Sequence, residues 1–211
     1  EGETMASISG AGTLSEIEMR LHAPTSLMSS RIIPVCLPIM QAFSHLLFHF
    51  CVDDSPDRAV KLRTADTDFA IISREELTAD MNYKALQPEQ YVLVAPAAWK
   101  GRRLQEIIQQ ERIVDYNAED QVTYQYLKEY HLFDHANHRR YFVNQTDHLA
   151  LLVAEGVGYT TLTKEFAEPY VKSGRLIMLN KARAYHCHPL LAWYNRPAPP
   201  PYFQAIIQAI R

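Results

Sequence analysis

The 211-residue sequence lacks several features on which whole classes of protein depend. It has only seven glycines, and it contains neither the Gly-x-Ser-x-Gly elbow of serine hydrolases nor the glycine-rich loops that bind phosphates and dinucleotides. No apolar run approaches the roughly 20 residues of a membrane span, and we find no secretory signal peptide. These absences disfavour a nucleotide-dependent enzyme, a serine hydrolase and a membrane protein.

Basic charge is scarce as well. The 21 Lys and Arg residues are outnumbered by 24 Asp and Glu residues, which gives a formal net charge of −3. Proteins that bind DNA directly neutralise phosphates with clustered Lys and Arg, and this sequence has no such cluster. We therefore do not expect this chain to bind DNA by itself.

The cysteine pattern indicates the compartment. Cys36, Cys51 and Cys187 form an odd set without a CxxC pair, which is typical of buried free thiols. Free thiols persist in reducing surroundings, so we expect a cytoplasmic protein.

Two series of alternating strands and helices follow an N-terminal tail, residues 1–15. Hydrophobic periodicity predicts strands near residues 17–23, 48–52, 68–72, 91–95, 113–116, 141–144, 159–162, 176–179 and 190–194, with helices between most of them. Residues 73–90 are polar and are predicted to have little regular structure. Continuous apolar strands favour a mostly parallel sheet covered on both faces.

The predicted fold class is therefore α/β, with two Rossmann-like lobes joined by two crossover strands. Lobe I comprises residues 16–94 plus 192–211, and lobe II comprises residues 95–191. The helix within residues 27–47 contains Pro34 and Pro38, so we expect it to start late, kink or split.

Ligands of such sheets bind beyond the carboxyl ends of strands, where helix N-termini present free N–H groups. Polar residues that follow the predicted strands are therefore the candidate ligand-binding residues: Thr25, Ser26, Ser73, Asp120, Gln121, Asn144 and Thr146. For Thr25, Ser26 and Thr146, simple helix capping is an alternative role that is compatible with ligand contact. An amino acid with its carboxylate at these N-termini and its amino group near Asp120 would suit the arrangement.

Catalytic and metal sites are not predicted. His131, Asp134, His135 and His138 have helical spacing, but residues 133–137 resemble a helix end and turn, which would break the alignment. His186 and His188 are two imidazoles on one strand face with no further ligand. Neighbouring carboxylates at 53–54 resemble a solvated strand end. We predict no catalytic residue, no metal and no cofactor.

Several sequence patches, in a fixed order, resemble one known family. The strongest is residues 149–159 (LALLVAEGVGY), a helix that ends in an apolar-Val-Ala-x-Gly-apolar-Gly turn. Residues 170–176, 63–71 and 101–116 match further patches, with Ala65 where Gly is usual. Thr163 replaces a common Pro, and residues 43–54 are atypical. In these patches the chain resembles the effector-binding domain of LysR-type transcriptional regulators, and residues 115–121 resemble the arginine/lysine-responsive subgroup.

The resemblance implies a type 2 periplasmic-binding-protein fold that binds a small-molecule effector, an amino acid or small organic acid, between its lobes. It further implies a homodimer or homotetramer that contacts DNA only through an N-terminal winged helix-turn-helix, which this chain lacks. A free solute-binding protein of a transporter is the main alternative. An enzyme of the related prephenate dehydratase or deaminase type is a third. Neither membrane contact nor a cofactor is implied.

Overall fold

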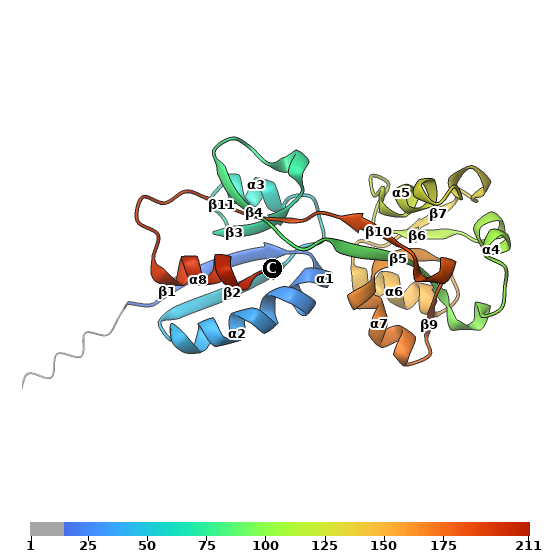
Figure 1. The fold of residues 1–211 in the computed structure, drawn as a ribbon, viewed down its shortest axis with the longest axis horizontal. Coiled ribbons are helices and arrows are strands. Elements are labelled where there is room, and N and C mark those ends of the chain that lie inside the picture. The colour runs from blue at the N-terminus through green and yellow to red at the C-terminus, as the bar shows by residue number, and fades with distance from the viewer. Residues whose placement is uncertain (1–14) are drawn as a thin grey trace, which may run out of the picture.

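The computed structural model describes residues 15–211, so the predicted N-terminal tail lies outside the described residues except for Ser15. Two groups of sheets and helices lie side by side along the long axis of the molecule (Figure 1). The chain passes between them twice, and these two passages form the backbone connection between the lobes.

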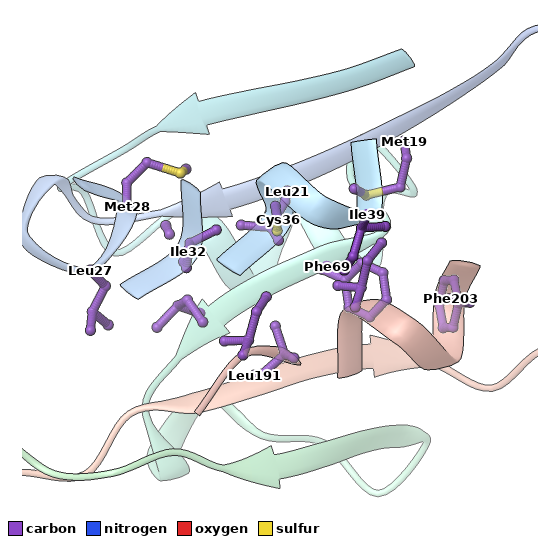
Figure 2. Close-up of a cluster of buried hydrophobic side chains, with 14 of the residues drawn as sticks. Met19, Leu21, Leu27, Met28, Ile32, Cys36, Ile39, Phe69, Leu191 and Phe203 are labelled. Atoms are coloured by element: carbon purple, nitrogen blue, oxygen red, sulfur yellow. The ribbon is translucent and has the colours of Figure 1, made fainter. Parts of the chain in front are cut away.

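Lobe I is built on a five-stranded sheet with the order β2-β1-β3-β11-β4. Its strands are β1 (Ile17–Ala23), β2 (Leu46–Val52), β3 (Phe69–Ile72), β4 (Met81–Ala85) and β11 (Leu190–Tyr194). Its helices are α1 (Thr25–Leu27), η1 (Met28–Ile32), α2 (Ile33–Ala42), α3 (Arg58–Arg63), η2 (Arg74–Glu76) and α8 (Pro201–Ala209). Helices α2 and α8 cover one face of the sheet, where Cys36, Phe69 and Phe203 lie in the largest apolar cluster (Figure 2).

The proline-containing helix begins earlier than we expected. The chain is helical from Thr25 to Ala42, so the helix does not start late, but a π-helical turn interrupts it between α1 and α2, which agrees with the alternative expectation of a split. This wider turn, η1, directly precedes α2, in which Pro34 is the second residue. Proline lacks an N–H and its ring clashes with the carbonyl four residues back, and the wider turn accommodates both effects.

Lobe II contains a sheet with the order β10-β5-β8, on which β9 also pairs with β5, and a two-stranded sheet of β6 and β7. Its strands are β5 (Glu89–Pro96), β6 (Ile113–Asp115), β7 (Arg140–Phe142), β8 (Thr160–Thr163), β9 (Leu176–Met178) and β10 (Ala184–Cys187). Its helices are η3 (Ala97–Trp99), α4 (Leu104–Gln110), α5 (Val122–Glu129), η4 (Phe133–His135), α6 (Thr146–Ala154), α7 (Lys164–Lys172) and η5 (Asn180–Ala182).

Strand β5 shows why residues 92–95 form a continuous apolar run. Leu93 and Ala95 pack in a cluster with α4 and α5, whereas Val92 and Val94 pack in a second cluster with α6 and α7. Both faces of the strand are therefore buried, as the continuous apolar run predicted.

The expected mostly parallel sheet is wrong. Five of the eight strand pairings are antiparallel, because each crossover strand enters the neighbouring lobe against the direction of the strands it meets. Residues 81–85, expected to be irregular, form the edge strand β4 on β11. Only Met81 of that strand is buried, so its own sequence carries little strand pattern.

The glycines of the strongest sequence patch each have a structural role. Gly156 follows the last turn of α6 with φ +88°, the left-handed conformation that glycine tolerates best. A Cβ atom on Gly158 would lie 2.4 Å from the carbonyl oxygen of Arg112, so only glycine fits there. Thr163 caps α7 by accepting a hydrogen bond from the Phe166 N–H.

Candidate functional site

A cavity of about 650 Å³ lies between the lobes, within the range typical of small-molecule sites. Loops that follow β1, β2, β3 and β6, the start of α6, strand β8 and both crossovers contribute to its lining. A second cavity, of about 450 Å³, shares Asp54, Tyr116 and Thr146 with the first.

The structure brings the seven candidate residues to these two cavities. Five line the larger cavity: Ser26, Ser73, Asp120, Gln121 and Thr146. The remaining two, Thr25 and Asn144, line the smaller cavity. The rule that ligands bind beyond the carboxyl ends of strands thus selected residues that share one region of the molecule.

Asp54 links the two lobes at this region. Its Oδ1 accepts a hydrogen bond from the Thr25 backbone N–H at 2.7 Å, and its Oδ2 accepts one from the Thr25 hydroxyl at 2.8 Å. The same Oδ2 accepts hydrogen bonds from the Thr146 hydroxyl at 2.9 Å and from the Thr146 backbone N–H at 3.4 Å. The carboxylate therefore stabilises helix starts in both lobes.

This geometry corrects two interpretations of the sequence. Thr146 does not cap α6 with its own side chain: Gln145 is the N-cap residue, and the Thr146 hydroxyl donates to Asp54 instead. Asp54 was interpreted as part of a solvated strand end, but it is a partly buried cavity residue with several donors. Nothing local to residues 53–54 indicates the contact, because Thr146 lies 92 positions away.

Glu89 is a second cavity residue that the sequence did not reveal. Its side chain is 6% exposed, and its Oε1 accepts a hydrogen bond from the Ser26 hydroxyl at 3.1 Å. Desolvation raises the pKa of Glu89 to about 7, although the Ser26 hydrogen bond and the positive charge of Arg31 oppose that rise. Glu89 comes at the end of a polar stretch, where the sequence gives no reason to expect a buried residue. It is buried because β5 begins at this residue.

Ser73 and Asp120 also have structural roles. Ser73 forms a capping box with Glu76, in which the Ser73 N–H donates to Glu76 Oε2 at 2.8 Å. The Asp120 carboxylate accepts from the backbone N–H groups of Val122 at 3.0 Å and Tyr116 at 3.2 Å, which orders the loop after β6. Gln121 is the N-cap residue of α5, but its side chain makes no capping bond.

A buried polar network supports lobe II beneath the cavity. The Thr123 hydroxyl donates to Asp115 at 2.8 Å and lies 2.9 Å from the hydroxyl of Thr161, which lines the cavity. Arg140 forms an ion pair with the same Asp115. Desolvation and the nearby charge of Asp120 raise the pKa of Asp115 to about 6.

The larger cavity is lined by more acidic than basic side chains. Five carboxyl groups contribute to it: Asp54, Glu76, Glu89, Glu119 and Asp120. One guanidinium, that of Arg58, faces the same cavity, and its Nε and Nη1 groups donate to the backbone carbonyls of Ile71, Asp53 and Ser55. Such a lining attracts positive charge.

The histidines and cysteines form no metal-binding group in residues 15–211. His138 instead packs against the rings of Tyr124 and Phe133. All three cysteines are free, but only Cys36 is buried, whereas Cys51 and Cys187 are half-buried. Within the same described range, the helices are too short or too polar to cross a membrane.

Comparison with known proteins identifies the fold. The family profile described as the LysR substrate binding domain matches residues 14–211. ArgP from Mycobacterium tuberculosis has 13% identity and a TM-score of 0.76, over 94% of this chain and 68% of that protein. LysG from Corynebacterium glutamicum, solved with bound effector Arg, has 14% identity and a TM-score of 0.72, over 94% and 68% of the two chains.

A regulatory domain alone gives a similar match. The regulatory domain of CcmR from Synechocystis, in complex with 2-PG, has 13% identity and a TM-score of 0.73, over 92% of this chain and 97% of that domain. No curated protein matches the chain by sequence. At these low identities the solved structures show a shared fold.

Proposed function

The chain belongs to the LysR substrate-binding domain family, and we propose that it binds a small polar effector in the cavity between its lobes. Members of this family are the effector-sensing domains of DNA-binding transcription regulators. The observation that carries the proposal is the 650 Å³ cavity, which both lobes line with the polar residues that follow their strands. Among the similar structures, LysG has bound effector Arg and the regulatory domain of CcmR is in complex with 2-PG.

An effector that contacts both lobes is able to bind their different arrangements with different affinity. A ligand can shift a conformational equilibrium only if it binds the two conformations with different affinity. Ser26 and Ser73 come from lobe I and Asp120 and Gln121 from lobe II, so an effector that contacts both sets would stabilise one angle between the lobes. The ligand-binding roles of all seven candidate residues are part of this proposal, and Thr25 and Thr146 would contact an effector beside Asp54, which accepts from both.

The finer properties also remain proposals. We propose that the full regulator is a cytoplasmic homodimer or homotetramer, that it contacts DNA through a separate N-terminal domain, and that this domain does not transform its ligand. The division into lobe I, residues 16–94 plus 192–211, and lobe II, residues 95–191, stays a prediction, and the crossover strands β5 and β11 span its two boundaries. The similarity to regulators favours this function over a transporter's solute-binding protein.

A thermal-unfolding screen with amino acids, organic acids and amines tests the proposal. A ligand at 100 times its dissociation constant should add about 2.7 kcal/mol to the free energy of unfolding. Calorimetry should then show that Gln121→Trp, which fills the cavity from the start of α5, abolishes binding. Gln125→Trp is the matched control, because Gln125 is exposed on the same helix and does not line the cavity. Equal binding by both variants would place the ligand elsewhere.

A further inference from the structure

The donors at the two helix starts in this cleft already have an acceptor in Asp54. Thr25 begins the continuous helical segment of residues 25–42, and Thr146 begins α6. Their N-cap residues, Pro24 and Gln145, make no side-chain capping bond. The Asp54 carboxylate supplies the missing acceptor to both helix starts through four hydrogen bonds.

A second carboxylate would therefore be unfavourable at this place. It would have to displace an acceptor that is part of the same chain, and such tethered groups act at effective concentrations of about 1 mM or more. If it did not displace Asp54, it would lie beside a like charge in a partly desolvated cleft, which costs several-fold in affinity at the least.

A positively charged ligand group, in contrast to a carboxylate, would be favourable in this cavity. Glu89 is buried and receives one hydrogen bond, from Ser26 to Oε1, from the residues that the structure describes. Its second oxygen remains available to a donor in the cavity. Tyr91 and Tyr116 line the same space, and aromatic rings beside carboxylates are suited to ammonium and guanidinium groups. The charges around Glu89 are Arg31, Arg58 and Glu165, with Tyr91 and Cys187 as its titratable neighbours.

We propose that the effector is an organic cation, a primary amine or a guanidine, that carries no carboxylate. The inference rests on the proposed function of the cleft, and it replaces the amino acid that the sequence suggested. The protein itself supplies the carboxylate that would otherwise come from the ligand, and the remaining acidic lining binds the cation. Such a domain discriminates a decarboxylated amine from the amino acid of the same length.

Matched pairs of probes test this discrimination. Calorimetry on the whole chain compares 1,5-diaminopentane with lysine, and agmatine with arginine. In each pair we expect the amine to bind at least about tenfold more tightly, because the amino acid brings a like charge next to Asp54. Equal or tighter binding of the amino acid overturns the proposal.

Substitution of Asp54 tests the cause. Asp54→Ala leaves the Thr25 and Thr146 donors without this acceptor. The affinities of lysine and arginine, relative to those of the corresponding amines, should therefore rise by about tenfold or more. Asp54→Asn removes the charge but keeps a carbonyl acceptor. This variant replaces Asp54→Ala in the test if the alanine variant does not fold. Asp57→Ala is the matched control, because Asp57 is an exposed carboxylate three positions away that lines neither cavity. An unchanged preference in a folded Asp54 variant overturns the assigned role.

The two proposals fail in different ways. An amino acid or organic acid that binds more tightly than the amines, and that Gln121→Trp excludes, overturns the cation proposal and leaves effector binding in the cleft intact. Absence of binding by every compound, amines included, overturns both.

Discussion

Replacing Glu89 with glutamine should stabilise the unliganded protein, and the gain should depend on pH. The Glu89 carboxyl has a pKa of about 7 in the folded protein, against an ordinary value of 4.5, because burial disfavours its ionised form. The two pKa values differ by about 2.5. At about 1.4 kcal/mol per pKa unit, this difference corresponds to a destabilisation of the folded protein by about 3 kcal/mol when the carboxyl must ionise. Glutamine is nearly the same size and carries no such penalty.

The sign of the effect follows from proton linkage. Below pH 4.5 the folded and unfolded chains both bind the proton, so Glu89 costs nothing by this mechanism. Between pH 4.5 and about 7 the unfolded chain has lost its proton while the folded chain retains it, so stability falls as the pH rises. Above pH 7 the full penalty is present. The advantage of Glu89→Gln over the native protein should therefore be small at pH 5 and largest at pH 8.

Urea unfolding at pH 5 and pH 8, monitored by circular dichroism, measures this difference directly. At pH 8 the gain of up to about 3 kcal/mol would raise the melting temperature by about 6–12 °C in a protein of this size. Glu168→Gln is the control, because Glu168 is an exposed carboxylate paired with Lys172 on α7. If Glu89→Gln changes stability equally at both pH values, the reasoning from burial is wrong. The same substitution should weaken amine binding, because it removes a cavity carboxylate.

Three substitutions in lobe II test other features of the fold by urea unfolding. Tyr126→Phe should cost about 1–2 kcal/mol, because the buried hydroxyl donates to the Arg183 carbonyl. Tyr159→Phe should be neutral or stabilising by up to about 1 kcal/mol, because that buried hydroxyl has no hydrogen-bond partner among the described residues. A larger loss for Tyr159→Phe than for Tyr126→Phe would refute both assignments. Gly158→Ala should cost about 2 kcal/mol or more, since its Cβ would overlap the Arg112 carbonyl oxygen, and an unchanged unfolding midpoint would contradict that geometry.

Local patterns in the sequence were sufficient to predict most elements of the fold. The apolar run at 91–95 predicted a strand buried on both faces, and β5 has this structure. The glycine at 156 predicted the end of α6, and its positive φ agrees with that prediction. These signals are reliable because periodicity and helix termination depend on a few neighbouring residues. The edge strand β4 was missed because its pairing with β11, more than 100 residues away, decides its conformation.

From residue patterns alone, the sequence predicted most of the order of strands and helices, and with it the loops that meet at the cleft. It placed Thr25, Ser26, Ser73 and Thr146 there because the carboxyl ends of neighbouring strands lie at one edge of a sheet. The electrostatic character of the cleft, in contrast, depends on contacts between residues that are far apart in the sequence. A carboxylate at position 54 meets a helix start 92 residues later, and the residue at position 89 is buried against Ser26 from the first helix. Charge and desolvation depend on what surrounds a residue in space, and no local pattern contains that information.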